Sequence, residues 1–286
     1  MAFNGARLNP SEQPWDTTNY THPSDPNLSE LHRAMQYNTD GEPEIRITSS
    51  LSLTSAPWNV QVARGLVTGV TGLSISGYRA SSGTGFYPAW EGTTYTYFTT
   101  AQVVRVWSNS ASDTDVSVRI DGLDANYATQ TETVVLTNGA TGVLSTKLFL
   151  RVNSISLTRV PQNAGLIHAG SSDKTVTLAY IGTVANQSAG RSQMTVYTVP
   201  AGYTFYLTQS NWYQGANQTA FYRSWTQSPT GLITVVLTFP LLDTYNSTKV
   251  VPRPYSEKTD IQWQASVSNN SAIGGQIEGY LIQNGL

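Results

Sequence analysis

The chain has 286 residues, a net charge of -2, only 12% charged residues and no cysteine. This balance excludes the basic footprint of a nucleic-acid-binding protein and a polybasic membrane patch, so neither nucleic acid nor a membrane is expected as a partner. The lack of thiols excludes disulfides, thiolate nucleophiles and zinc–thiolate sites. Because no apolar signal segment precedes NPSEQPW and no run of 18 apolar residues occurs, we expect assembly in a host cytoplasm.

Residues 1–45 predict an extended N-terminal arm, because Pro, Asn, Asp and Ser dominate there without lasting periodicity. One short helix is expected from Asp25 to Tyr37, with Asp25 as N-cap and Pro26 in the first turn. The arm has large side chains but no core of its own, which predicts docking on another protein; an unattached tail is the alternative. The expected anchors are Trp15, Tyr20, Leu28, Leu31 and Met35.

Residues 46–286 predict a β-sandwich body, because Thr, Val, Tyr and Ile alternate with polar residues between Gly, Asn, Asp and Pro. The fold class is all-β and antiparallel, jelly-roll-like, as one large or two small sandwiches, with a possible seam at 160–174. The expected strands include VQVARGLVTGV, GLSISGYRA, TTYTYFTTAQVVRVWS, DVSVRI, TETVVLT, STKLFLRVNSISLTRV, TVTLAYIG, SQMTVYTV, TFYLTQSNWYQ, AFYRSWTQ, LITVVLTFP, DIQWQASVS and IEGYLIQ.

The segment RIDGLDANYATQTETVVLTN predicts a turn between two paired strands. Gly122 permits a positive φ, and Asp121 and Asp124 can accept hydrogen bonds from nearby backbone amides. The D-x-[DN]-x-[DN]-G pattern of a calcium loop is absent. We therefore interpret both aspartates as turn-forming, with a weak cation site or a catalytic pair as the alternatives.

The chain from about residue 100 to 285 resembles a family of virion structural proteins of tailed bacteriophages, seen often in phages of aquatic bacteria. The resemblance consists of a GLD-x-x-Y turn, an ETV-x-L-x-G strand, an F-x-RVN strand, an N-x-G-x-I hairpin and a YTVPAG-x-T-x-Y-L hairpin. These match Gly122–Tyr127, Glu132–Leu136 with Gly139, Phe149–Asn153, Asn163–Ile167 and Tyr197–Leu207. The departures are a longer turn at residues 137–139 and His168 in place of a β-branched residue. The resemblance implies a component of the virus particle.

No pattern of catalytic residues stands out. The three histidines are His22, His32 and His168; none has the spacing of a metal site, and no G-x-S-x-G motif accompanies a serine. Glu91, Glu132, Asp243 and Asp260 are conceivable paired carboxylates for glycoside cleavage, but nothing in the sequence selects them, and we interpret them as solvated or turn-capping acids. We expect no enzyme activity and no cofactor or metal.

Aromatic residues are dense in GFYPAWEGTTYTYF and NWYQGANQTAFYRSW, which favours core packing, subunit contact or recognition of a host surface glycan. VVPRPYSEKTDIQW is expected in a loop or edge strand, because proline cannot donate to a sheet. The interaction candidates from these stretches are Trp90, Trp212, Tyr213, Trp225 and Arg253.

The sequence as a whole predicts a non-enzymatic virion structural protein of a tailed phage. Within that class we expect a capsid decoration or minor head protein that docks on other virion proteins through its arm. A homo-oligomer, with a trimer favoured by the class, is expected. The alternatives are a tail, adaptor or fibre-base component, a host receptor- or glycan-binding module, and a polysaccharide-cleaving enzyme.

Overall fold

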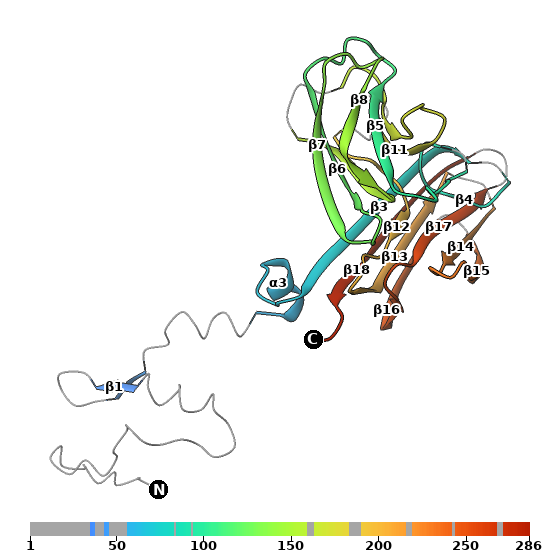
Figure 1. The fold of residues 1–286 in the computed structure, drawn as a ribbon. Coiled ribbons are helices and arrows are strands. Elements are labelled where there is room, and N and C mark those ends of the chain that lie inside the picture. The colour runs from blue at the N-terminus through green and yellow to red at the C-terminus, as the bar shows by residue number, and fades with distance from the viewer. Residues whose placement is uncertain are drawn as a thin grey trace, which may run out of the picture. The chain divides into compact units, whose positions relative to one another are not determined.

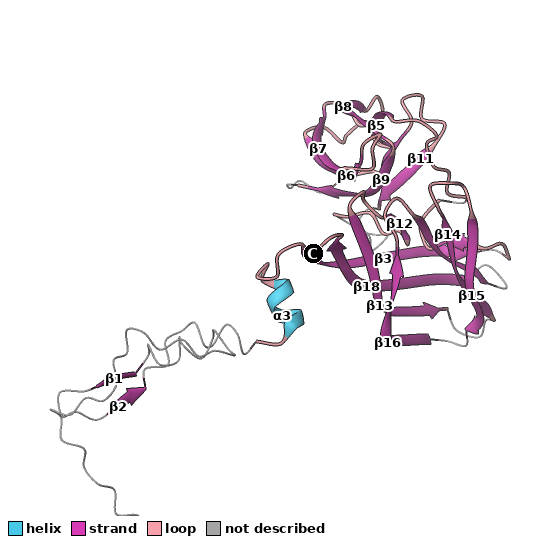
Figure 2. Ribbon diagram, turned by 60° about the horizontal axis from the view of Figure 1, so that its bottom comes forward, coloured by secondary structure: helices cyan, strands magenta, loops and turns pink. Residues whose placement is uncertain are grey.

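The computed structural model describes residues 35–37, 43–45, 56–82, 84–92, 94–158, 163–182, 190–215, 219–241, 244–267 and 271–286. The chain divides into two compact units, Met1–Leu66 and Val67–Leu286. The second unit consists of antiparallel strands, drawn in magenta in Figure 2, so the predicted all-β sandwich class is confirmed. No helix among the described residues is long and apolar enough to span a bilayer.

The N-terminal unit contains a small hairpin in which β1 (Met35–Tyr37) pairs with β2 (Pro43–Ile45). The helix predicted from Asp25 to Tyr37 is therefore wrong at its C-terminal end, because residues 35–37 form a strand. Strand β2 provides hydrogen-bond partners for the backbone amides and carbonyls of residues 35–37, and this pairing outweighs the weak helix propensity of the segment. Residues 25–34 lie outside the described residues.

The helix that the structure describes in this unit is α3 (Trp58–Ala63), where the sequence predicted the start of a strand. Pro57 accepts hydrogen bonds from the backbone amides of Val60 and Gln61, and the Gln61 side chain donates to the Ala56 carbonyl. Proline is favoured at a helix start, because it has no amide to leave unpaired there. The local N-terminal signal thus outweighs the alternation of Val60 and Val62 that suggested a strand.

The second unit contains two sandwiches, each with its own apolar core. The first, called here the inserted sandwich, has sheets in the orders β11-β10-β5-β8 and β7-β6-β9. Its strands are β5 (Gln102–Ser108), β6 (Val116–Leu123), β7 (Thr129–Leu136), β8 (Val143–Phe149), β9 (Arg151–Leu157), β10 (Ile167–Gly170) and β11 (Thr177–Ile181).

The second, called the framework sandwich, has sheets in the orders β16-β13-β18-β3 and β12-β17-β14-β15, with β4 also paired to β17. Its strands are β3 (Val70–Ser82), β4 (Tyr87–Pro88), β12 (Val196–Thr198), β13 (Tyr203–Gln214), β14 (Ala220–Gln227), β15 (Ile233–Leu241), β16 (Thr244–Tyr255), β17 (Asp260–Val267) and β18 (Ser271–Gln283). In Figure 1 the cyan strand β3 lies beside the red strand β18, its hydrogen-bonded neighbour.

The chain order shows that one sandwich is inserted into the other. The framework core includes Ala89 and the inserted core begins with Trp90; the return occurs between Val196 and Tyr197. The possible seam at 160–174 contains β10, which pairs with both β5 and β11. The strands on either side of it in the chain, β9 and β11, belong to the two different sheets of the inserted sandwich, so no boundary between sandwiches falls there.

Two further sequence expectations are refined by the strand pairing. STKLFLRVNSISLTRV was expected as one strand, but Leu150 separates β8 from β9, which belong to different sheets. A break at this position lets the chain cross from one sheet of the sandwich to the other. Pro252 and Pro254 lie on β16, an edge strand, as their missing amide donors predicted.

Candidate functional site

A buried ion pair joins the two sandwiches. Arg151 on β9 and Asp260 on β17 form two parallel contacts, 2.7 Å from Nε to Oδ1 and 2.8 Å from Nη2 to Oδ2. The Thr198 hydroxyl donates a third hydrogen bond, of 2.6 Å, to Asp260 Oδ1. A planar, bidentate pair of this kind fixes orientation as well as distance.

Arg151 also donates hydrogen bonds to two backbone carbonyls, and the face of its guanidinium lies over two tyrosine rings. Its Nη1 donates to the carbonyls of Phe98 at 2.8 Å and Leu150 at 2.9 Å. The guanidinium lies over the rings of Tyr97, at 4.7 Å, and Tyr127, at 5.5 Å. Burial lowers the pKa of Arg151, but the hydrogen bonds and charge of Asp260 outweigh it and the net shift of the pKa is upward. The Arg151 guanidinium therefore stays charged.

Asn153 extends the junction, again between the two sandwiches. Its amide nitrogen donates to the Thr198 carbonyl at 3.0 Å, and its amide oxygen accepts from the Thr198 backbone at 2.9 Å. The backbone of Ala201 donates to the Tyr127 carbonyl at 2.8 Å. The GLD-x-x-Y turn, the F-x-RVN strand and the YTVPAG hairpin thus meet in one place, although they are far apart in the sequence.

The GLD turn forms as expected, but Asp121 and Gly122 have roles that differ from those predicted. Asp124 accepts backbone hydrogen bonds from Asn126 and Ala128, at 2.8 and 2.9 Å, whereas Asp121 pairs with Arg119 on the same strand. Asp121 is therefore not turn-forming. The positive φ falls on Tyr127, at 63°. Gly122 is needed instead for close approach, because a Cβ there would lie 2.2 Å from the Arg151 carbonyl.

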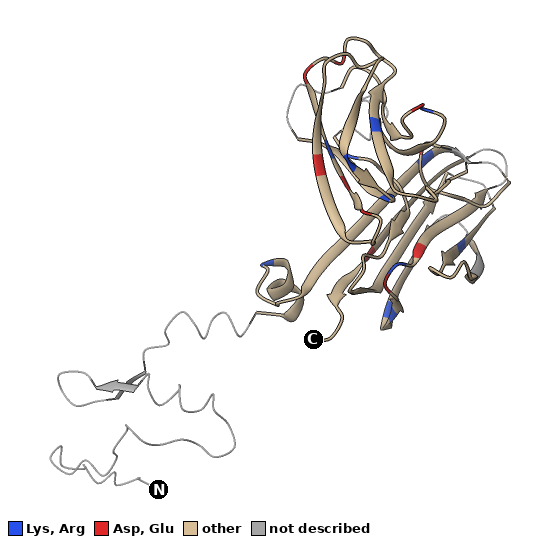
Figure 3. Ribbon diagram, in the orientation of Figure 1, with Lys and Arg blue, Asp and Glu red and all other residues tan. Residues whose placement is uncertain are grey.

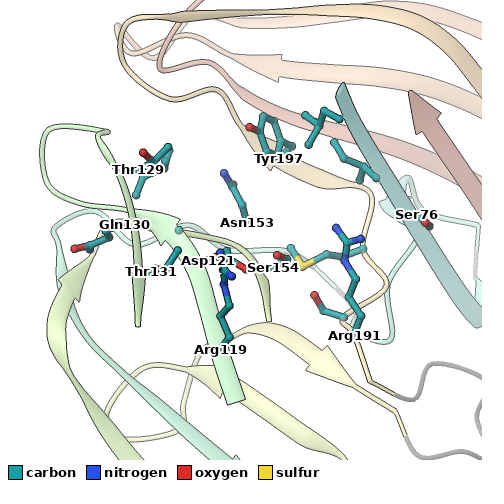
Figure 4. A pocket seen from close by; sticks show the side chains of 16 residues that line it. Ser76, Arg119, Asp121, Thr129, Gln130, Thr131, Asn153, Ser154, Arg191 and Tyr197 are labelled. Carbon is teal, nitrogen blue, oxygen red and sulfur yellow. Dashed lines mark hydrogen bonds and ion pairs between the residues drawn. The ribbon is translucent and has the colours of Figure 1, made fainter. Parts of the chain in front are cut away.

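A pocket of about 320 Å³ lies beside this junction (Figure 4). Strands β6, β7 and β9 of the inserted sandwich form one side, and β3 with the segment leading into β12 forms the other. The lining residues are Leu73, Ile75, Ser76, Arg119, Asp121, Gly122, Leu123, Thr129, Gln130, Thr131, Asn153, Ser154, Arg191, Ser192, Met194 and Tyr197.

Some polar side chains of this pocket have a partner within the protein and others do not, among the residues that the structure describes. Arg119 Nε lies 2.8 Å from Asp121 Oδ1. Among the residues that the structure describes, none forms an ion pair or hydrogen bond with the guanidinium of Arg191 or the hydroxyl of Tyr197. Burial raises the pKa of Tyr197, so its hydroxyl remains protonated and can donate a hydrogen bond. Two cations and one anion line the pocket, and no carboxylate among the described residues pairs with Arg191.

The predicted interaction residues do not gather in one site. Trp15, Tyr20, Leu28 and Leu31 lie outside the described residues, and Met35 lies on β1. Trp90 and Trp212 are buried in the two cores. Of the alternatives predicted for these aromatic residues, core packing therefore applies to both. The Trp90 ring contacts Tyr95 and Tyr180, with centroid distances of 5.1 and 5.2 Å.

The other three candidates are more accessible. The Trp225 ring is half-buried and stacks on Tyr97 across the two sandwiches, at 6.4 Å and an interplanar angle of 12°. Tyr213 is exposed. Its ring packs directly over Gly274, so closely that a side chain at position 274 would collide with it. Arg253 lies 5.6 Å above the Tyr255 ring.

An apolar bulge projects from the edge strand β16. The register with β13 passes from Gln209 opposite Thr248 to Leu207 opposite Arg253, so residues 249–252 face Thr208 alone. Within this bulge Val250 is 99% exposed and Val251 is 81% exposed. Figure 3 shows how sparse charged residues are along the strands of this unit. An exposed apolar surface on a sheet edge is typical of a protein contact.

Most residues of the junction lie in motifs whose local pattern indicates only turns and strands. Asn153 and Tyr197 lay in recognised motifs, and Arg191 was not selected at all. Nothing in the local pattern marks Arg191, because its role depends on strands that are remote in the sequence. The described residues contain no group of three or more His, Asp or Glu side chains that could hold a metal ion.

No family model matches the chain, and no curated protein matches it. Among solved structures, a mutant VP2 protein of infectious bursal disease virus in derived T=1 particles is similar at 10% identity, over 75% of this chain and 72% of that chain, with a TM-score of 0.16. A structure of the infectious bursal disease virus Gt strain is similar at 10% identity, over 80% and 79% of the two chains, with a TM-score of 0.17. Similarity at this level transfers no function.

Proposed function

We propose that this chain is a non-enzymatic structural protein of a tailed-phage virion, and within that class a capsid decoration or minor head protein. The supporting observation is the convergence of three motifs that resemble phage virion proteins. Tyr127, Arg151 and Thr198 come from different motifs and meet around one ion pair.

The mechanism proposed is assembly through the N-terminal arm of residues 1–45. The arm would order against a neighbouring virion protein and offset its lost chain entropy by burying Trp15, Leu28, Leu31 and Met35. Many copies on a symmetric particle would convert weak individual contacts into strong attachment. The body that the arm carries is stiffened by the buried ion pair between Arg151 and Asp260.

The body also supports a contact between copies. Val250 and Val251 project from β16, and the net charge of -2 over 286 residues opposes self-association only weakly. We propose a homo-oligomer, with a trimer as the expected state, in which this bulge packs against a second copy.

The test is deletion of residues 1–45 from the full chain. The truncated protein should keep its strand-rich circular dichroism spectrum and its cooperative melting, but lose binding to purified capsids. The matched control replaces the arm with a Gly/Ser segment of equal length, which restores length without apolar anchors and should not restore binding. If the truncated chain binds capsids as well as the full chain does, docking through the arm is refuted.

Copy number separates the capsid from the tail assignment. A decoration or minor head protein should be present on the order of hundreds of copies per particle, whereas a tail, adaptor or fibre-base component should reach about a dozen, because each follows the symmetry of its location. Quantitative gels of purified virions measure this directly. A receptor-binding module, in contrast, would keep its affinity for host cells after removal of the arm.

A further inference from the structure

We propose that the pocket beside the sandwich junction binds a saccharide that carries a single carboxylate, such as a uronic acid unit. The proposal is independent of the location on the virion, because it uses only side chains of residues 67–286. It depends on three features of the pocket: an unpaired cation, a set of hydroxyl and amide groups, and an apolar wall.

The unpaired cation is Arg191. Its guanidinium lines the pocket, and no carboxylate among the described residues pairs with it. A guanidinium presents two parallel N–H groups that match the geometry of a carboxylate. An incoming carboxylate would therefore find its strongest contact here.

The charge of the pocket limits the ligand to a monoanion. Arg119 is already paired with Asp121, so Arg191 supplies the only surplus positive charge among the residues lining the pocket. A doubly charged phosphate would meet the Asp121 carboxylate with a second negative charge that no lining cation balances. The single negative charge of a carboxylate is balanced by the positive charge of Arg191.

The remaining polar groups suit the hydroxyls of a sugar. The Tyr197 hydroxyl has no partner among the described residues and can donate. The second carboxylate oxygen of Asp121 is likewise unengaged there and can accept, since only Oδ1 contacts Arg119. Figure 4 places Asp121 and Asn153 on one side of the pocket and Tyr197 on the other. Donors and acceptors on facing walls match a ring with hydroxyls on both edges.

The apolar wall suits the C–H face of the same ring. Leu73 and Ile75 of β3 line the framework side of the pocket, and Met194 of the inserted core also lines it. The cavity volume of about 320 Å³ is at the small end of the range of small-molecule sites, which favours one short unit over a long chain.

The experiment titrates the full chain with sodium glucuronate, glucose and sodium acetate, followed by ¹H–¹⁵N NMR. Glucuronate should bind with millimolar affinity and shift the amide signals of residues 119–123 and 191–197. Glucose lacks the carboxylate and acetate lacks the ring, so each should bind at least about tenfold more weakly. Equal affinity for glucuronate and glucose, or for glucuronate and acetate, overturns the proposal, as does no binding of glucuronate at millimolar concentration.

Two variants assign the contacts. Arg191→Gln should weaken glucuronate binding about tenfold or more and leave glucose unchanged, because only the carboxylate contact is removed. Tyr197→Phe should weaken both saccharides about threefold, because it removes one neutral hydrogen bond. Arg64→Gln, at an exposed arginine outside the pocket, is the matched control and should change nothing. If Arg191→Gln binds glucuronate like the parent chain while its spectrum shows an intact fold, the assignment is wrong.

Discussion

Arg151 and Asp260 are 109 residues apart in the chain and form a buried bidentate ion pair between the two sandwiches. Loss of one partner leaves the other as an uncompensated buried charge. We expect Arg151→Met to lower the free energy of unfolding by about 3–5 kcal/mol, measured by urea denaturation.

The matched control for that substitution is the exposed pair of Arg119 and Asp121, whose side chains are 51% and 31% exposed. Solvent screens this pair, so Arg119→Met should cost about 0–1 kcal/mol. Equal losses for the two arginine variants would show that the junction pair has no special role in stability.

Gly77 on β3 should tolerate no side chain. A Cβ there would lie 2.2 Å from the Ala89 carbonyl oxygen and 2.7 Å from the Thr195 amide nitrogen. Both are backbone atoms, which cannot rotate away, so Gly77→Ala should destabilise the fold by about 1–3 kcal/mol or more. Gly72, on the same strand, has nothing within 4 Å, and Gly72→Ala should be within about 0.5 kcal/mol of the parent. Thermal melting of the two variants distinguishes them.

His168 should make stability depend on pH. Its ring stacks on Trp107 at 5.0 Å and meets the Tyr180 ring at 4.7 Å, while Lys174 lies 6.0 Å from the Trp107 ring. Burial, with a contribution from the Lys174 charge, lowers the pKa of His168 from 6.5 to about 4. The unfolded chain therefore binds the proton more readily than the folded chain between these values.

The stabilising contribution of neutral His168 is present in full above pH 6.5 and falls as pH drops from 6.5 to about 4. We expect His168→Phe to keep the aromatic stack and to flatten the melting temperature across this window. The difference between the two melting curves isolates His168 from carboxylates that titrate in both proteins. Parallel curves would contradict the lowered pKa.

Val250 and Val251 should matter for association and not for folding. Both are almost fully exposed, so the double substitution Val250→Ser with Val251→Ser should leave the melting temperature within error of the parent. If the β16 bulge packs against a second copy, sedimentation should show the variant shifted toward monomer. Leu148→Ser, at an exposed leucine of β8, is the control and should leave the oligomer intact.

The sequence alone determined the fold class, because alternation of side chains along a strand and glycine or asparagine at turns are local properties. Asp124 capped its turn as predicted, and Pro252 marked an edge, since each effect needs only neighbouring residues. The same alternation placed Trp212 and Tyr213 on opposite faces of β13. It could not say that Trp212 faces the core, because that depends on which sheet covers the strand.

Only the tertiary structure decided the insertion of one sandwich into the other, the meeting of Arg151 with Asp260, and the pocket that contains Arg191. Each depends on strands from distant parts of the chain, whose pairing is selected by the packing of whole sheets. A side chain that is an ordinary strand residue in its own segment thereby becomes a junction or a candidate ligand contact.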